Sequence, residues 1–178
     1  TRIRQKLHRE IADELRRLDL FSPLSDQQIE ELASSSAKLR YAEDETLVRQ
    51  GTPGESLYLI RTGRARVEVS GAGGSRATVA ELGPGDFFGE MSLLTGEPRS
   101  ATVNALEETE VVVVDRDGLA PILASDMGIV EQLSEHLEKR RSELEASLAD
   151  LSSRSSRARK GKERKDDLLS RIRGFFGV

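Results

Sequence analysis

The sequence predicts a mainly β domain with flanking helices, built as a double-stranded β-helix, or jelly-roll, barrel. Short β-branched runs alternate with glycine-rich turns between about residues 37 and 115, and apolar residues recur at helical spacing before and after that stretch. We therefore expect N-terminal helices over residues 1–36, a barrel with a short inserted helix over 37–125, and a long C-terminal helix over 126–151.

The N-terminal region carries one apolar stripe. Its members are spaced by four or three residues, with Arg and Lys between them, as is typical of an amphipathic helix: Ile3, Leu7, Ile11, Leu15 and Leu18. Ser22-Pro23 ends this helix. Ser25, with Gln28 three residues later, has the pattern of a capping box and predicts a second short helix. We expect both helices to pack beside the β region.

Runs of apolar and β-branched residues in the central region predict short strands. They lie at residues 46–48, 57–60, 65–69, 77–80, 101–103 and 111–114. Turn signals separate them, and we interpret Gly51, Gly54 and Gly63 as turn residues that shape the barrel without touching a ligand. Arg61, next to one of these runs, is interpreted as a surface residue.

The segment after Pro121 returns to helical periodicity. Its apolar side is marked by Val130, Leu133, Leu137, Leu144, Leu148 and Leu151. One interpretation is a helix folded against the barrel. The other is a lid, with Val130, Leu133 and Leu137 as its lid residues, whose far half pairs with another helix because Leu137, Leu144 and Leu151 are seven apart. Arg140 interrupts that seam.

Composition excludes several classes of function. The formal net charge of -4 does not indicate a nucleic-acid binder, and we interpret the basic, Ser-rich tail over 152–178 as a disordered linker with a short amphipathic end. The absence of cysteine excludes disulfides and thiolate zinc sites. His8 and His136 fall in predicted helices outside every predicted strand, which argues against a metal-dependent jelly-roll enzyme. No apolar run approaches the roughly 20 residues of a membrane helix, so we expect a cytoplasmic domain.

One segment carries most of the chemical information, residues 88–103 with the sequence FGEMSLLTGEPRSATV. Glu90 and Arg99 lie nine residues apart around a predicted short helix that begins after Gly89. The N–H groups at the start of a helix and the planar guanidinium of Arg99 suit a phosphate, and the carboxylate of Glu90 suits a neighbouring sugar hydroxyl. The alternative is an ordinary exposed salt bridge between Glu90 and Arg99. The complete pattern favours a sugar-phosphate site.

The same segment resembles the phosphate-binding cassette of the cyclic-nucleotide-binding domain family, whose pattern is F-G-E, several residues, and then P-R-[ST]-A-[TS]-V. The likeness extends over about residues 18–140, through Gln50-Gly51, residues 57–60 and residues 83–87. It implies that Glu90 binds the ribose 2′-hydroxyl and Arg99 the cyclic phosphate. Within a cassette spanning 86–103, the expected ligand-binding residues are Phe88, Gly89, Glu90, Met91, Ser92, Arg99, Ser100 and Ala101.

The resemblance leaves the choice of base open. Family members with Thr or Ser after the arginine also contact the guanine amino group, so Ser100 is compatible with cGMP as well as cAMP. The resemblance implies a regulatory module and not an enzyme, with no metal and no cofactor besides the nucleotide.

We expect the module to control an upstream effector in the same protein, with a prokaryotic membrane channel as the favoured context. The helical lead-in and the start at Thr1 favour this interpretation, and the 27 residues after Leu151 are too few for a helix-turn-helix module. The alternatives are a free-standing cyclic-nucleotide receptor and a transcription-regulator-type sensor without its DNA-binding module. Specific nucleic-acid binding is not expected, and the leucines seven apart leave a homo-oligomer open.

Overall fold

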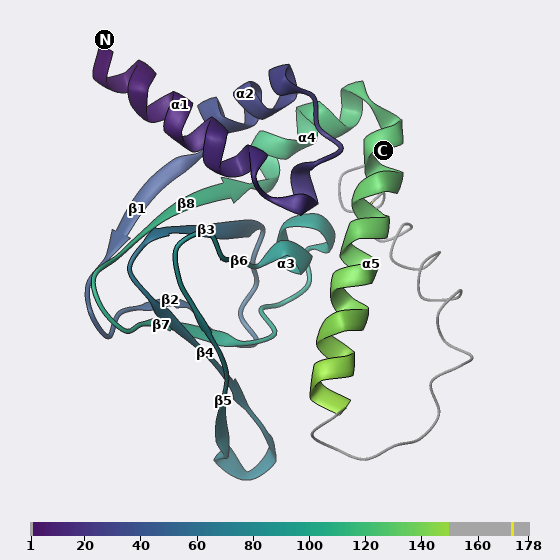
Figure 1. The fold of residues 1–178 in the computed structure, drawn as a ribbon. Helices are drawn as coiled ribbons and strands as arrows, with labels where there is room; N and C mark the ends of the chain where they lie inside the picture. The colour runs from purple at the N-terminus through teal and green to yellow at the C-terminus, as the bar shows by residue number, and fades with distance from the viewer. Residues whose placement is uncertain (1, 150–171, 173–178) are drawn as a thin grey trace.

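The computed structural model describes residues 2–149 and residue 172, and it confirms a mainly β domain with flanking helices (Figure 1). In chain order the elements are α1 (Arg2–Arg16), the 3-10 turn η1 (Asp19–Phe21), α2 (Asp26–Ser35), β1 (Ala37–Tyr41), β2 (Thr46–Val48), β3 (Ser56–Thr62), β4 (Ala65–Ser70), the 3-10 turn η2 (Ala72–Gly74), β5 (Arg76–Leu82), β6 (Phe87–Phe88), α3 (Glu90–Thr95), β7 (Thr102–Ala105), β8 (Thr109–Asp115), α4 (Arg116–Ser125) and α5 (Met127–Ala149).

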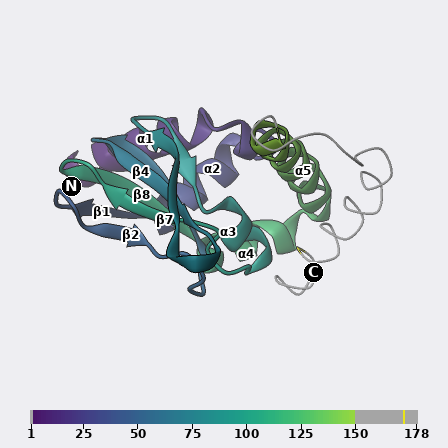
Figure 2. The same ribbon diagram turned by 90° about the horizontal axis from the view of Figure 1, so that it is seen from below.

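The described strands form two antiparallel sheets of four strands each. One has the order β1-β8-β3-β6 and the other the order β2-β7-β4-β5. Five predicted runs lie wholly within strands, the sixth, 101–103, overlaps β7 from Thr102 on, and the pairing adds β1 and the two-residue β6. The described strands pair only within their own sheet, so closure into a single jelly-roll barrel is not confirmed. Figure 2 shows α5 standing beside the strands, next to α3.

Both N-terminal helices form, but α1 ends at Arg16, earlier than predicted, so Leu18 lies beyond the helix and is buried next to η1. α1 buries Ile11 and Leu15 against the core, whereas Ile3, at its beginning, is 82% exposed and lies outside the buried part of the stripe. At the start of α2, the Ser25 hydroxyl accepts a hydrogen bond from Gln28 N and the Gln28 side chain accepts one from Ser25 N. This capping box satisfies two helix-end donors reciprocally and fixes the start of α2.

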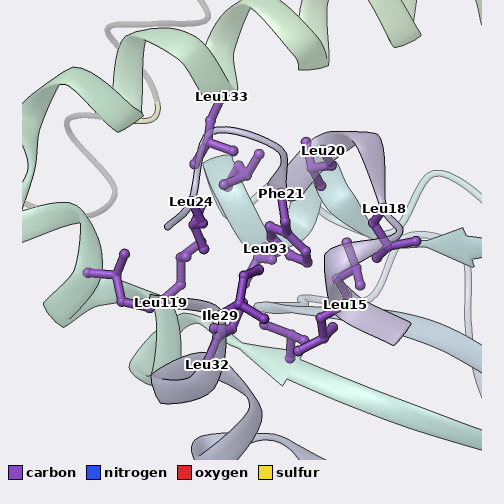
Figure 3. Packing of buried hydrophobic residues seen from close by; sticks show 14 of the residues in the cluster. Leu15, Leu18, Leu20, Phe21, Leu24, Ile29, Leu32, Leu93, Leu119 and Leu133 are labelled. Atoms are coloured by element: carbon purple, nitrogen blue, oxygen red, sulfur yellow. The ribbon is translucent and has the colours of Figure 1, made fainter. Parts of the chain in front are cut away.

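The larger cluster of buried apolar side chains, which we call the helical core, includes residues from both the N-terminal and the C-terminal parts of the chain, such as Ile11 and Ile172. It contains side chains from α1, η1, α2, α3, α4 and α5, many of which Figure 3 shows packed together, and it includes Leu93 and Leu94 of α3. A smaller cluster lies between the strands, around Ile60, Val103 and Val111. The short helix α3 is thus held by the same apolar core that positions the flanking helices, because its leucines face that core.

Helix α4 was not predicted, so the region expected to be barrel ends in a helix. Pro121 lies inside α4, where it removes a main-chain donor and usually breaks a helix. The helix forms because the Asp115 side chain accepts a hydrogen bond from Gly118 N and because Leu119, Ile122 and Leu123 are buried. The proline is visible in the sequence, whereas these tertiary contacts are not, so sequence analysis alone predicts no helix here.

Helix α5 packs against the rest of the domain. The predicted lid residues Val130, Leu133 and Leu137 are all fully buried in the helical core, so Leu137 packs within its own chain. The side chain of Leu144, and the whole of Leu151, lie outside the described residues. So does the predicted tail, except for Ile172, which is buried in the same core. Within the described part of the chain, no helix has the length and apolar character needed to cross a membrane.

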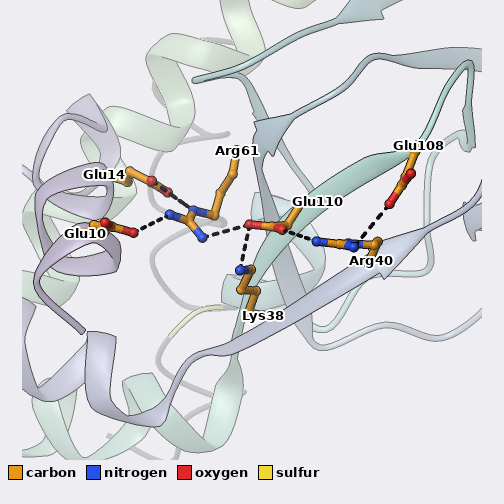
Figure 4. A network of polar contacts seen from close by, with 7 residues as sticks. All are labelled: Glu10, Glu14, Lys38, Arg40, Arg61, Glu108 and Glu110. Carbon is orange, nitrogen blue, oxygen red and sulfur yellow. Dashed lines mark hydrogen bonds and ion pairs between the residues drawn. The ribbon is translucent and has the colours of Figure 1, made fainter. Parts of the chain in front are cut away.

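An ion-pair network ties α1 to the strands (Figure 4). Arg61 at the end of β3 donates to Glu10 and Glu14 of α1 and to Glu110 of β8, at 2.8 to 3.0 Å. Its side chain is only 11% exposed, so the interpretation of Arg61 as a surface residue was wrong. The network forms because β3 presents this side chain toward the helix that covers it.

Glu110 lies at the centre of this network. Lys38 Nζ lies 3.1 Å from its Oε1 and Arg40 Nη2 lies 3.3 Å from its Oε2. Burial disfavours the ionised carboxylate, but the hydrogen bonds from Lys38 and Arg40 and the charge of Arg61 outweigh that effect. The pKa of Glu110 therefore lies below its ordinary value.

Candidate functional site

The cassette contains the predicted short helix, which follows strand β6 and a glycine turn. Phe88 ends β6, and Gly89 follows with φ of 87°, in the left-handed region where glycine is favoured. Helix α3 then runs from Glu90 to Thr95, and Gly96, whose φ is 72°, caps its C-terminal end. The short predicted helix is therefore present, and it begins where the glycine allows the chain to turn sharply.

Arg99 is buried beneath this turn, with 7% of its surface exposed. Its Nη1 donates to the main-chain oxygen of Ser56 at 2.6 Å, and its Nη2 donates to Ser56 Oγ at 2.9 Å. The guanidinium carbon also lies 5.5 Å from the ring centre of Tyr58. Burial lowers the pKa of the Arg99 guanidinium, against a smaller opposing effect of Tyr58. Among the described residues, no carboxylate forms an ion pair with this cation.

Two glycines make room for Arg99. A Cβ added to Gly54 would lie 2.2 Å from Arg99 Nε, and one added to Gly89 would lie 2.6 Å from Nη1 and 2.6 Å from the Ser56 carbonyl oxygen. Gly54 does not have a left-handed φ, so space and not backbone conformation requires glycine there. The interpretation of Gly54 as a simple turn residue was incomplete, because it forms a wall of the slot that holds the guanidinium.

Glu90 is equally buried, at 7% exposure, but it has a partner. Arg140 of α5 donates from Nε to Glu90 Oε1 at 2.6 Å and from Nη2 to the Phe87 carbonyl oxygen at 3.1 Å. The Arg140 guanidinium also lies 3.9 Å from the centre of the Phe87 ring. Glu90 and Arg99 therefore do not form the exposed salt bridge that was the alternative interpretation.

The other predicted ligand-binding residues have different surroundings. Phe88 stacks on Tyr58, with ring centres 5.0 Å apart and planes within 2°. Met91 is partly buried against the helical core, and the Ser92 hydroxyl donates to the main-chain oxygen of Glu97. Ser100 is exposed, and Ala101 is half-buried beside it. The structure thus gathers Phe88 and Arg99 around Tyr58, whereas the Ser92 side chain is already used within the cassette.

Sequence reasoning missed the contributions of Ser56, Tyr58 and Arg140. Ser56 and Tyr58 lie on β3 and face the cassette because β3 pairs with β6, with Tyr58 opposite Phe88. In the sequence Arg140 interrupts a seam of leucines, and this polar interruption of an apolar stripe is the available signal. The remaining titratable candidates lie elsewhere: His8 pairs with Glu30, and His136 with Ser22. Within the described residues, no group of three His, Cys, Asp or Glu side chains is placed to hold a metal ion.

Comparisons with known proteins agree with this geometry. The family model of the cyclic nucleotide-binding domain matches residues 38–126, half of the chain. The chain is 32% identical to the Cyclic AMP receptor protein of Thermus thermophilus over 140 residues, which cover 79% of this chain and 65% of the relative. It is 35% identical to the cAMP-dependent protein kinase regulatory subunit of Dictyostelium discoideum over 119 residues, which cover 64% of this chain and 35% of the relative. It thus spans less than two thirds of either relative's length.

A solved structure extends the likeness to three dimensions. The N-terminal domain of a transcriptional regulator from Streptomyces coelicolor A3(2) superimposes with a TM-score of 0.64 and 30% identity, covering 81% of this chain and 97% of that one. Fold, cassette and sequence similarity thus point the same way, and the chain belongs to the cyclic nucleotide-binding domain family.

Proposed function

We propose that this chain binds a cyclic nucleotide, with Arg99 as the ligand of the cyclic phosphate. The observation that carries the proposal is the burial of Arg99 without a carboxylate partner among the described residues. A buried charge without a counter-charge is unfavourable, and the two Ser56 oxygens offer only neutral acceptors. A phosphate at the open part of the guanidinium supplies the missing negative charge through charge-assisted hydrogen bonds.

Glu90 is proposed to bind the ribose 2′-hydroxyl. Arg140 uses Oε1 of this carboxylate, and an ionised carboxylate has further lone pairs for a hydroxyl donor. The remaining predicted contacts, from Phe88, Gly89, Met91, Ser92, Ser100 and Ala101, stay proposals of the same kind. In this arrangement the ligand is proposed to lie beside the cassette, within the module proposed over residues 37–125.

Both cAMP and cGMP fit this proposal. The similarity to a Cyclic AMP receptor protein and to a cAMP-dependent protein kinase regulatory subunit favours cAMP. Ser100 keeps a hydroxyl available for the base of cGMP, because its side chain is exposed at the edge of the cassette.

Regulation is proposed to act through α5. The contact between Arg140 and Glu90 joins this helix to the residue proposed for the ribose, so ligand binding and the position of α5 are coupled. Binding then favours the arrangement of α5 that has the higher affinity for the ligand. The shift in population is limited by the ratio of the affinities of the two arrangements. The effector that responds is proposed to lie outside residues 38–126. The relatives named above include a receptor protein and a kinase regulatory subunit, and they lend no support to the expected channel.

Displacement of a fluorescent cyclic nucleotide tests the proposed function. Unlabelled cAMP or cGMP should displace the probe at micromolar concentration, and adenosine should be far weaker because it lacks the phosphate for Arg99. Displacement by adenosine as effective as that by cAMP would contradict the assignment of Arg99, and a failure of both cyclic nucleotides at millimolar concentration would contradict the function itself.

A further inference from the structure

Ser56, the first residue of β3, contacts both terminal nitrogens of Arg99. Its main-chain oxygen accepts from Nη1 at 2.6 Å and its hydroxyl oxygen accepts from Nη2 at 2.9 Å. These two hydrogen bonds set the plane of the guanidinium, and Gly54 and Gly89 leave no space for it to shift toward their main chains. The serine side chain is therefore adjacent to the cation that the proposed function assigns to the phosphate.

The Ser56 hydroxyl keeps an unused donor. A serine hydroxyl has one hydrogen to donate and two lone pairs to accept with, and here one lone pair accepts from Arg99. Among the described residues, no protein group accepts a hydrogen bond from it. Ser56 is also half-buried and not sealed in the core, so the hydroxyl can meet a ligand. An unused donor beside a buried cation is suited to an anion.

Arg99 also keeps donors after binding Ser56. A guanidinium carries five N–H donors, and the two contacts with Ser56 use one from each terminal nitrogen. One of the remaining N–H groups is on Nη2, and the oxygen of the Ser56 hydroxyl lies 2.9 Å from that nitrogen. An oxygen of a bound phosphate that accepts from Arg99 is then within reach of the Ser56 hydroxyl, which can rotate toward it without breaking its contact with Nη2.

We infer that Ser56 is a further phosphate ligand, whose hydroxyl donates to an exocyclic oxygen of the cyclic phosphate while its oxygen holds Arg99 in place. This inference rests on the proposed function and adds to it a residue 43 positions away from Arg99 in the chain. Among the described residues, Arg99 is the only hydrogen-bond partner of the Ser56 hydroxyl, so its two proposed roles both concern the phosphate site.

Calorimetric titration of Ser56 variants with cAMP tests the assignment. Ser56→Ala should weaken binding about three- to tenfold, the effect of one hydrogen bond, and Ser56→Thr, which keeps the hydroxyl, should restore most of the affinity. Ser56→Asp should abolish measurable binding, since its carboxylate would pair with Arg99 and repel the phosphate. Ser34→Ala is the matched control, because Ser34 is an exposed serine of α2 whose hydroxyl bonds only within its own helix.

A second readout separates a phosphate ligand from a structural residue. The two phosphorothioate diastereomers of cAMP replace one or the other exocyclic oxygen by sulfur, so loss of a hydroxyl that donates to one oxygen should alter the ratio of their affinities. Wild-type affinity of Ser56→Ala, or an equal loss for cAMP and both diastereomers, would overturn the inference while leaving Arg99 in place. Failure of the wild-type protein itself to bind cAMP would instead overturn the proposed function, and the role of Ser56 with it.

Discussion

Arg140 of α5 contacts the first residue of α3, with its Nε 2.6 Å from Oε1 of Glu90. The two residues are 50 positions apart in the chain, and their contact fastens the C-terminal helix to the start of α3. Glu90 is nearly inaccessible, whereas the Arg140 side chain is about one third exposed. The charge that stabilises the buried carboxylate therefore comes from the helix that is proposed to move.

Arg140→Ala should loosen the second half of α5 in the ligand-free protein, because it removes the ion pair, the hydrogen bond to Phe87 and the stacking on its ring. Amide exchange measured for residues 138–143 should become several-fold faster, with little change for residues 129–134 in the apolar core. Lys139→Ala, on the same helix turn and exposed, is the control. Equal exchange in the two variants would show that the ion pair does not hold the helix.

Glu90→Ala should weaken the binding of cAMP more than that of 2′-deoxy-cAMP, because the carboxylate is proposed to accept from the 2′-hydroxyl. A hydrogen bond to a charged group is worth about 1.5–3 kcal/mol, or roughly a ten- to hundredfold change in affinity. Competition titrations with the two nucleotides measure the difference. The same loss for both ligands would indicate that Glu90 maintains the cassette and does not contact the ribose.

Leu133→Ala should destabilise the domain by about 2–5 kcal/mol, since it removes a fully buried side chain from the helical core. Urea denaturation measures the free energy of unfolding. Met127→Ala, at the exposed beginning of α5, should change it by less than about 1 kcal/mol. A small effect of Leu133→Ala would favour the interpretation of this part of α5 as a loosely attached lid over the interpretation as a fixed element of the core.

The free energy of unfolding should fall with acidification partly through Glu110. Its pKa is depressed in the folded protein, so its stabilising contribution is present above the ordinary value of 4.5 and is lost as the pH falls through the lower folded value. Glu110→Gln should be less stable than the wild type at pH 7, and the difference should shrink below about pH 4. Urea denaturation at several pH values checks this. A difference that does not depend on pH would mean that the charge of Glu110 is not involved.

The cassette could be predicted from the sequence because its information is local. Gly89, Glu90 and the short helix follow one another in the chain, and a left-handed glycine before a helix leaves a sequence pattern. The capping box at Ser25 is local in the same way. The mainly β class followed from strand periodicity, which depends on neighbouring residues.

The rest depended on contacts between distant segments. Ser56 reaches Arg99 and Arg140 reaches Glu90 only after the strands and helices have packed, so no spacing in the sequence marks these pairs. Arg61 looked like a surface residue because its partners Glu10, Glu14 and Glu110 come from other elements. Helix α4 was missed because the cap and buried side chains that hold it outweigh the effect of Pro121.

The central claim is that the buried cation of Arg99 binds the phosphate of a cyclic nucleotide, and calorimetry of the wild-type protein beside Arg99→Ala tests it most directly. Arg9→Ala, an exposed arginine of α1, is the matched control. The wild type and the control should bind cAMP or cGMP with a dissociation constant of about 1 μM or lower, on the order of -8 kcal/mol, and Arg99→Ala should bind roughly ten- to hundredfold more weakly. Equal affinities of Arg99→Ala and the control, or no heat from folded wild-type protein at millimolar nucleotide, would contradict the account.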